Sequence, residues 1–257
     1  MTDTMIEARG LSRYFGGLRA VDGVDLRVRA GSVHAIIGPN GAGKTTLFNL
    51  LSGYLKPTAG QVLLRGRDTT GVPLHQMSRL GVGRSFQITN VFPSLTVLEN
   101  VRLAAQARGR DSLKLWRRAA SLGDYLARAR RALAQVGLAE REGDLAATLP
   151  HGDKRRLELA ILLAGDSELL LLDEPTAGMA TEQVPLLLDV LRKVMAEGGK
   201  TILIVEHNMG VVMSMSDTVT VMHQGRVLAE GAPAAIAANP EVQRAYLGES
   251  YSHDAHA

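Results

Sequence analysis

The stretch that decides the fold of this chain reads Gly38-Pro39-Asn40-Gly41-Ala42-Gly43-Lys44-Thr45. It satisfies the whole pattern G-x-x-x-x-G-K-[ST], and it lies between a short apolar segment, Val33–Ile37, and the start of a predicted helix, Thr46–Leu51. The glycines let the backbone curl so that successive N–H groups form an anion nest at a helix N-terminus. An ordinary turn requires neither three glycines nor the Lys-Thr pair. The stretch therefore predicts a nucleotide phosphate site, with Lys44 on the phosphates and the Thr45 hydroxyl on Mg²⁺.

The composition of the 257-residue chain, with 46% hydrophobic and 21% charged residues, is that of a soluble globular protein. No apolar run reaches the roughly 18 residues that a membrane-spanning helix needs. The first residues, Met1–Thr4, lack the layout of a signal peptide. Cysteine is absent, which excludes disulfides, cysteine zinc sites and thiol catalysis and is typical of a reducing compartment. These features together predict a cytosolic protein.

The net charge of +3 is unevenly distributed along the chain. Basic residues gather between Arg102 and Arg131, where only Asp111 and Asp124 oppose them. The basic residues there are Arg102, Arg108, Arg110, Lys114, Arg117, Arg118, Arg128, Arg130 and Arg131. A solvated helical face explains this run, and so does a surface near anionic lipid headgroups. Nucleic acid is the weaker alternative, because no binding signature accompanies the charge.

The order of predicted elements indicates an α/β core that a helical block interrupts. Apolar runs predict strands at Met5–Leu11, Val24–Val28, Val33–Ile37, Gln61–Leu64, Val82–Gln87, Leu169–Asp173, Thr201–Glu206, Val219–Met222 and Arg226–Glu230. Helical spacing predicts short helices at Val72–Leu80, Glu182–Glu197, Ala234–Ala238 and Val242–Leu247, and a helical block over about residues 96–164. We therefore expect a single domain over residues 5–248, with its core in 5–95 and 165–248, and a flexible tail over 249–257, of which Ser250–Ala257 is predicted to be loose.

Two carboxylates follow the apolar run Leu169–Leu172. In open α/β sheets, ligands gather at the carboxyl ends of the strands. Asp173 is placed there to hold Mg²⁺, through water, and Glu174 to polarise a water that attacks the γ-phosphate. Two acids at a strand end are unspecific when taken alone. Their combination with the phosphate loop makes the prediction specific.

Three further side chains lie where the same site is expected. His207 follows the strand Thr201–Glu206 and is placed to contact the γ-phosphate. Gln87 ends the strand Val82–Gln87 and offers an amide to Mg²⁺ or to the attacking water. Phe15 is a candidate to stack on the adenine ring, although an aromatic residue at such a position is also commonly part of a core.

These elements, in this order and spacing, resemble the nucleotide-binding subunits of ABC transporters over nearly the whole chain. The resemblance implies a P-loop NTPase fold of the ABC type, with an antiparallel β subdomain and an inserted α-helical subdomain. It implies ATP and Mg²⁺ as ligands, and it makes Gly38–Thr46 the Walker A loop. It also implies that Phe15 stacks on adenine, that Gln87 is the Q-loop glutamine, that Asp173 and Glu174 form the Walker B pair with Glu174 as the catalytic base, and that His207 is the switch histidine.

Several shorter sequence stretches resemble one subfamily, the ATP-binding subunit of branched-chain amino acid importers, whose close relatives serve urea and short amides. The stretches that carry this resemblance are 15–21 (FGGLRAV), 84–87 (RSFQ), 92–100 (FPSLTVLEN), 175–179 (PTAGM) and 245–248 (AYLG). The resemblance implies a peripheral ATPase on the cytoplasmic face of the plasma membrane. Its implied partners are two membrane permease subunits, a sister ATPase or a second copy of itself, and an extracytoplasmic binding protein that acts through the permeases, with no nucleic acid. We expect the apolar segment Ile88–Leu95 to form part of the groove for a permease helix.

The chain departs from the family at the signature loop, which is commonly L-S-G-G-Q and aligns with Leu149–Asp153. Pro150 stands where a serine would offer its hydroxyl and N–H to the γ-phosphate of the opposite subunit. Asp153 replaces the glutamine and is expected to repel a triphosphate. In the following D-loop, Ala180 stands where many relatives carry aspartate. Because the signature acts on the partner's nucleotide, we expect the weakened site to be the partner's.

Two other classes of protein share the phosphate loop. Soluble ABC ATPases of DNA repair or translation usually carry two cassettes, a coiled-coil insertion or zinc cysteines, and this sequence has none of these. A GTPase requires an Asn-Lys-x-Asp motif, and no asparagine here precedes a lysine. A small-molecule kinase would lack the pair formed by Glu174 and His207. An ATPase that powers an importer is therefore the leading interpretation.

Overall fold

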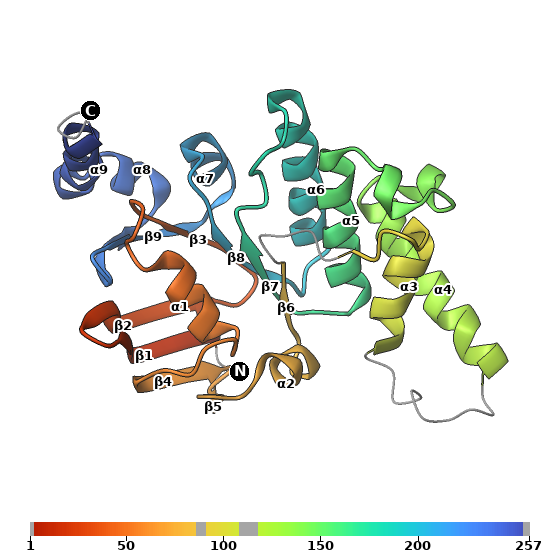
Figure 1. Ribbon diagram of the computed structural model, residues 1–257, viewed down its shortest axis with the longest axis horizontal. Helices are drawn as coiled ribbons and strands as arrows, with labels where there is room; N and C mark the ends of the chain where they lie inside the picture. Colours follow the sequence, from red (N-terminus) through yellow and green to blue (C-terminus); the bar gives the residue numbers. More distant parts are fainter. Residues whose placement is uncertain (1–2, 86–90, 108–117, 254–257) are drawn as a thin grey trace.

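The computed structural model describes residues 3–85, 91–107 and 118–253. Gln87, Ile88 and the centre of the basic run therefore lie outside the described residues. Within the described ranges, two sheets lie next to each other, and a group of helices covers the far end of the larger sheet (Figure 1).

The smaller sheet is antiparallel, in the order β2-β1-β4-β5. Its strands are β1 (Thr4–Phe15), β2 (Leu18–Arg29), β4 (Ala59–Leu64) and β5 (Arg67–Asp68). The first two strands are longer than the sequence predicts, because their register continues to the pair Phe15 and Leu18. The two-residue turn between them begins at Gly16, whose φ of 58° suits a tight hairpin. The residues near the turn show no apolar pattern that predicts a strand. They are part of the strands because they pair with each other across the hairpin.

The larger sheet has the order β10-β9-β3-β8-β7-β6. Its strands are β3 (Val33–Ile37), β6 (Val82–Arg84), β7 (Leu169–Asp173), β8 (Thr201–Val205), β9 (Thr218–His223) and β10 (Arg226–Gly231). All neighbours are parallel except β9 and β10, which form an antiparallel hairpin whose turn contains Gln224. The described part of β6 ends at Arg84, so it is shorter than the predicted strand.

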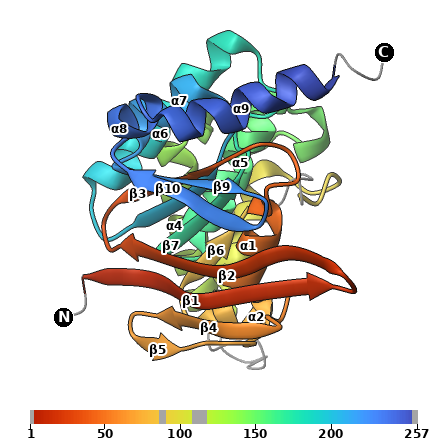
Figure 2. The same ribbon diagram turned by 90° about the vertical axis from the view of Figure 1, so that its left-hand side faces the viewer.

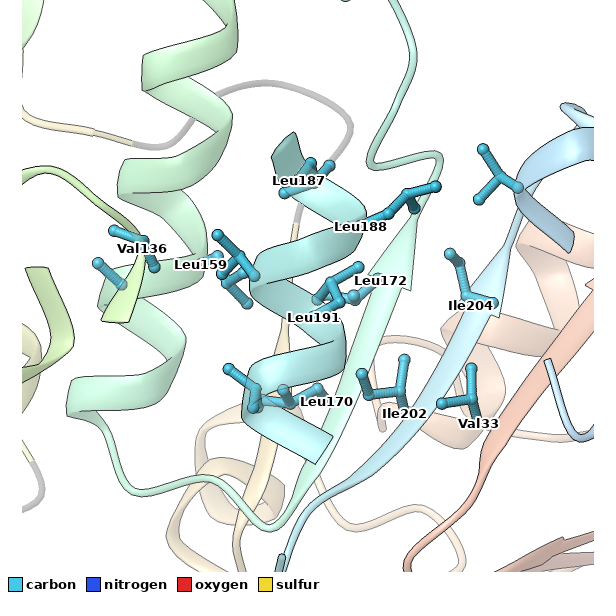
Figure 3. Packing of buried hydrophobic residues seen from close by; sticks show 14 of the residues in the cluster. Val33, Val136, Leu159, Leu170, Leu172, Leu187, Leu188, Leu191, Ile202 and Ile204 are labelled. Carbon is cyan, nitrogen blue, oxygen red and sulfur yellow. The ribbon is translucent and has the colours of Figure 1, made fainter. Parts of the chain in front are cut away.

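Both faces of the central strands of the larger sheet are buried, and alternate residues of β3, β7 and β8 enter different cores. Leu170 and Leu172 of β7 pack with Ile202 of β8 under helix α6 (Val184–Ala196), as Figure 3 shows. Leu169 and Leu171 point to the other face, in a cluster with helix α1 (Lys44–Leu51) and the smaller sheet. This two-residue period explains why the strand reads as a continuous apolar run. The helix α1 that follows the phosphate loop is thus held between the two sheets (Figure 2).

The described residues between β6 and β7 contain α-helices and short 3₁₀ turns, together with a single β-bridge between Thr96 and Leu145. The helices are α3 (Val97–Ala107), α4 (Arg118–Gln135) and α5 (His151–Ala164), and they pack on one another at one end of the molecule (Figure 1). This arrangement agrees with the predicted α/β class with an antiparallel sheet and an inserted helical block. Within the described residues, no helix is both long and apolar enough to cross a bilayer.

The remaining helices are α2 (Leu74–Arg79), α7 (Met209–Met215), α8 (Pro233–Ala237) and α9 (Pro240–His253). Helix α9 continues past Ser250, whereas the sequence predicts a loose tail from that residue. Extending a nucleated helix fixes few additional dihedral angles for each new hydrogen bond, so the glycine and serines near its end do not stop it.

Candidate active site

The phosphate loop connects β3 to α1 and needs glycine at two positions for steric reasons. Gly38 has a φ of 147°, and a Cβ there would lie 2.2 Å from the carbonyl oxygen of Met222. Gly43 has a φ of 98°, and a Cβ there would lie 2.3 Å from the carbonyl oxygen of Ala20. Because both obstacles are backbone atoms, neither can move aside easily. The loop is therefore clamped between the β9–β10 hairpin and β2, with its curl fixed by the sheet around it.

Lys44 is folded over this loop. Its Nζ donates hydrogen bonds to the carbonyl oxygens of Gly38 at 2.6 Å and Pro39 at 2.7 Å, and the residue is only 6% exposed. The ammonium group is thus held at the loop's centre by carbonyl dipoles before any phosphate arrives. This placement agrees with the role that the sequence predicts for Lys44.

A cavity of about 620 Å³ opens beside the loop, a size typical of small-molecule sites. Its lining consists of Leu18, Arg19, Ala20, Asn40, Gly41, Ala42, Gly43, Lys44, Thr45, Thr46, Glu174, His207 and Gln224. The structure therefore brings most of the predicted site residues to one cavity. Leu18, Arg19, Ala20 and Gln224 also line the cavity; the first three lie in the stretch 15–21, whose resemblance to the family is the only sequence signal for them.

Phe15, the predicted adenine-stacking residue, is not part of this lining. It lies at the end of β1, 44% exposed, and the guanidinium of Arg13 covers its ring at 4.7 Å from the centroid. Leu18 and Arg19, across the hairpin turn, line the cavity in its place. Adenine stacking by Phe15 stays a prediction, and it requires Arg13 to leave one face of the ring or the base to use the other.

Glu174 and His207 meet at the rim of the cavity. The Nε2 atom of His207 lies 2.6 Å from Oε1 of Glu174, a distance at which an N–H on Nε2 donates a hydrogen bond to the carboxylate. Glu174 has a φ of 49°, an unfavourable conformation for a residue with a side chain. Its backbone N–H donates to the carbonyl of Val205, which fixes this conformation beside β8. The two predicted catalytic residues are thus brought together from adjacent parallel strands.

Glu206 joins the turns that carry these two residues. Its buried carboxylate accepts hydrogen bonds from the backbone N–H and hydroxyl of Thr176, at 3.1 and 2.7 Å, and from the N–H of His207 at 3.1 Å. The carboxylate of Glu206, which is only 3% exposed, therefore fixes the two turns at the rim of the cavity to each other. The sequence gives a weak signal for this role, since Glu206 precedes His207 as Asp173 precedes Glu174.

Asp173 is 1% exposed and lies at the end of β7. Burial raises the pKa of its carboxyl, and the guanidinium of Arg84 opposes that rise from 3.8 Å. Its Oδ1 atom is buried without a hydrogen-bond partner among the described residues. An oxygen of this kind, together with the Thr45 hydroxyl at the start of α1, suits Mg²⁺, which takes one or two protein oxygens and completes its shell with phosphate and water. Gln87, the other predicted Mg²⁺ ligand, lies outside the described residues.

The loop before α5 differs from its predicted chemistry in one respect. Pro150 precedes the helix as its N-cap, so this position supplies no N–H. Asp153, however, is buried and pairs with two arginines of its own chain: Arg141 at 3.1 Å, and Arg156. These two pairs oppose the repulsion of a triphosphate that the sequence predicts for Asp153, because two cations already face its carboxylate; the repulsion itself stays a prediction.

The described part of the basic run is partly paired. Arg102 contacts Glu99 at 2.8 Å, and Arg130 contacts Glu142 at 3.0 Å. Arg128 and Arg131 are exposed on α4. The solvated face and the lipid-facing surface both stay predictions for these residues.

Comparison with known proteins gives a consistent result. The ABC transporter family matches residues 21–177, and the family described as "Branched-chain amino acid ATP-binding cassette transporter" matches residues 226–252. The chain is 41% identical to the high-affinity branched-chain amino acid transport ATP-binding protein LivG of Salmonella typhimurium, with 97% of this chain and 100% of LivG covered.

Solved structures show the same relationship in three dimensions. An ATP-binding cassette of an ABC transporter in its ADP conformation superposes with a TM-score of 0.84 at 28% identity, covering 96% of this chain and 100% of the cassette. A dimeric ATP-binding cassette in a post-hydrolysis state with ADP and Pi superposes with a TM-score of 0.76 at 25% identity, covering 89% and 99%.

Proposed function

The chain belongs to the ABC transporter family as an ATP-binding subunit, and from this premise we propose that it hydrolyses ATP to power an importer of branched-chain amino acids. The observation that carries the proposal is the contact of 2.6 Å between Glu174 and His207 at the mouth of the phosphate-loop cavity. A base and a histidine at this position suit the attack of water on a γ-phosphate. A site that only bound nucleotide would not need this strained glutamate.

The residues divide the work of hydrolysis among them. The curled loop and the N-terminus of α1 offer N–H groups to the phosphates, and Lys44 exchanges its carbonyl partners for β- and γ-oxygens. Glu174 accepts a proton from the attacking water, and His207 holds the glutamate in place and responds to the γ-phosphate. Thr45 and Asp173 would hold Mg²⁺, which supplies neutralisation of the phosphate charge. Phe15 and Gln87 keep their predicted roles within this proposal.

The proposed cargo rests on the relatives, since LivG is named for branched-chain amino acid transport and the C-terminal part of this chain matches a family of the same description. A urea or amide importer is the alternative, because the cargo never touches an ATPase subunit. We propose that the chain dimerises, with a sister ATPase or a second copy, on two permeases fed by a binding protein. It would lie at the cytoplasmic face of the membrane.

A groove between α2, β6, α3 and α5 is the proposed seat of a permease helix. It measures about 410 Å³, and its walls include Leu74, Arg84 and Ala104. Phe92 is 59% exposed, while Val91 packs against the core. Among the described apolar residues of the predicted segment, Phe92 and Pro93 are exposed and open to a partner, although neither lines this groove. Phe92→Glu should uncouple transport without affecting MgATP binding, and crosslinks from Phe92 that never reach the permeases would contradict this placement.

The function is tested by removing the lysine of the phosphate loop. Lys44→Ala should abolish MgATP binding by the full chain, and ATPase activity and uptake of leucine by the complex reconstituted with its permeases. Lys56→Ala, which removes an exposed lysine outside the cavity, is the matched control and should leave all three unchanged. Unchanged MgATP affinity in Lys44→Ala would contradict the assignment of the site. A reconstituted complex that moves urea but not leucine would correct the cargo.

A further inference from the structure

Arg84 is a buried cation at the junction of three parts of the molecule. Its side chain is only 7% exposed, and its guanidinium lies 5.5 Å from the ring centroid of Phe48 and 5.6 Å from that of Tyr54. Its Nη1 donates a 2.7 Å hydrogen bond to the hydroxyl of Ser52, the C-cap of α1. A planar guanidinium suits this combination of ring faces and a directed hydrogen bond, whereas an ammonium group does not. Arg84 thus joins β6 to the far end of the phosphate-loop helix.

The same side chain approaches the proposed Mg²⁺ site. Its Nη2 lies 3.8 Å from Oδ2 of Asp173. The other carboxylate oxygen, Oδ1, has no hydrogen-bond partner among the described residues. The two oxygens of Asp173 are therefore in different surroundings, one facing a fixed cation and the other left for a further ligand.

Arg84 also forms part of the wall of the groove between α2, β6, α3 and α5. The groove and the Asp173 carboxylate are thus separated by one side chain. The outer cover of that side chain, Tyr54, is 61% exposed. Because Arg84 itself lines the groove, a partner bound there can contact its side chain directly.

We propose that Arg84 is a positioning residue that holds Asp173 for Mg²⁺. Through Arg84, occupancy of the groove by a permease helix would change the position of the Asp173 carboxylate. This inference rests on the proposed function, because it requires a permease in the groove. A displacement of the guanidinium by an ångström or two changes its attraction to Asp173 strongly at this depth, where water does not screen the pair. A docked permease helix can therefore strengthen or weaken the Mg²⁺ site through this contact alone.

A purely structural role for Arg84, holding β6 against α1, makes a different prediction from the proposed one. Loss of packing lowers stability and weakens ATP binding equally with and without Mg²⁺. Loss of the positioning role weakens only the part of binding that depends on Mg²⁺. Outer-shell residues that orient a metal ligand typically contribute tenfold to a hundredfold in metal affinity.

The experiment uses the full chain and titrates a fluorescent ATP analogue in EDTA and at a series of Mg²⁺ concentrations. Arg84→Met keeps the length of the side chain and removes its charge. It should raise the Mg²⁺ concentration at half-saturation by about tenfold and leave binding in EDTA within about twofold of wild type. Arg79→Met is the matched control, because Arg79 lines the same groove and is exposed. It should leave the Mg²⁺ dependence unchanged.

The second measurement compares ATPase activity of the subunit alone and in the complex with its permeases. Arg84→Lys retains a charge near Asp173 but loses the stacking on Phe48 and Tyr54. It should keep its Mg²⁺ dependence within about threefold of wild type and lose most of the stimulation by the permeases. This variant also decides the matter if Arg84→Met does not fold.

Two results would overturn the inference: a folded Arg84→Met with the Mg²⁺ dependence of wild type, or an Arg84→Lys that the permeases stimulate normally. Failure of the proposed function itself is visible separately. In that case the wild-type chain neither binds MgATP nor assembles with the permeases.

Discussion

The phosphate loop and the loop before α5 are both connections that end at a helix N-terminus, but they are built for different electrostatics. The phosphate loop has Gly38 and Gly43 fixed against backbone carbonyls and a buried lysine at its centre. The loop before α5 begins with Pro150, which has no N–H, and continues to Asp153, whose charge two arginines cancel. The N-terminus of α1 is therefore arranged to bind a triphosphate, whereas the loop before α5 offers a triphosphate neither an N–H at Pro150 nor a free charge.

This difference matters because the two loops serve different nucleotides in the proposed dimer. The phosphate loop of this chain would be completed by the partner's signature, while the loop at Pro150 would face the partner's nucleotide. In this proposed dimer the chain would hydrolyse ATP at its own Walker A loop and would contribute little to hydrolysis at its partner's loop.

The largest effect should come from the catalytic base. Glu174→Gln keeps the shape and the contact with His207 but removes the basicity, and general bases contribute roughly 10²–10⁴ in rate. In a complex with a sister ATPase that has an intact signature, this change should abolish most ATP turnover while ATP binding persists. Disabling the sister's catalytic glutamate should leave most of the turnover. Steady-state ATPase of the two single-mutant complexes makes the comparison, and equal losses would refute the asymmetry.

A matched pair of glycine substitutions compares the two loops directly. In Gly43→Ala the new Cβ meets the backbone carbonyl of Ala20 at 2.3 Å and the positive φ is strained, a cost of about 2 kcal/mol or more, so MgATP should bind roughly thirtyfold more weakly. In Gly152→Ala the obstacle at 2.3 Å is the flexible end of Gln183, which can turn away. Turnover of the complex should then change by less than about twofold.

The readouts for this pair are an MgATP titration of the Gly43→Ala chain and the ATPase rate and melting temperature of the Gly152→Ala complex. The contrast between a rigid and an adaptable loop fails if both substitutions weaken their sites to the same degree.

The contrast also shows which features a sequence reveals. The phosphate loop and the Asp173-Glu174 pair were predictable, because local chemistry fixes both the residue types and their spacing. The same holds for β7 and β8, whose apolar runs report burial on two faces. The meeting of Glu174 with His207 required only that adjacent parallel strands end at one rim.

Other features depend on contacts between distant residues and carry no local signal. Asp153 pairs with Arg156 one helical turn away, which the sequence spacing allows, but its second partner Arg141 lies twelve positions away on a separate turn, and nothing near Asp153 indicates that pairing. The role proposed for Arg84 depends on its contacts with Phe48 and Asp173, which the fold brings together from far apart. Phe15 lies outside the cavity lining because the β1–β2 hairpin extends further than its apolar pattern. Tertiary structure decides all three.

The proline should account for an intermediate effect, measurable at the partner's site alone. In a complex that carries Glu174→Gln, the remaining turnover comes from the partner's nucleotide. Pro150→Ser adds a hydroxyl and an N–H there and supplies a favourable N-cap, so this residual rate should rise about tenfold, the value of one charge-assisted hydrogen bond. Pro150→Ala restores only the N–H, so its residual rate should lie between those of the unchanged chain and Pro150→Ser. A residual rate that neither variant changes would mean that the helix N-terminus already compensates for the proline.

Asp153 should have the smallest effect on turnover, because its charge is already paired. Asp153→Asn in the same Glu174→Gln complex should change the residual rate by less than about twofold and lower the stability of the chain by about 1–3 kcal/mol, measured by denaturant unfolding, since two cations lose their partner. Arg141→Gln is the informative companion, because it leaves the carboxylate with Arg156 alone and should lower the residual rate further than Asp153→Asn does. A severalfold faster rate in Asp153→Asn would show that the carboxylate leaves its arginines and faces the triphosphate when the dimer closes. The contrast between the two loops would then rest on charge as well as on the missing donors of Pro150.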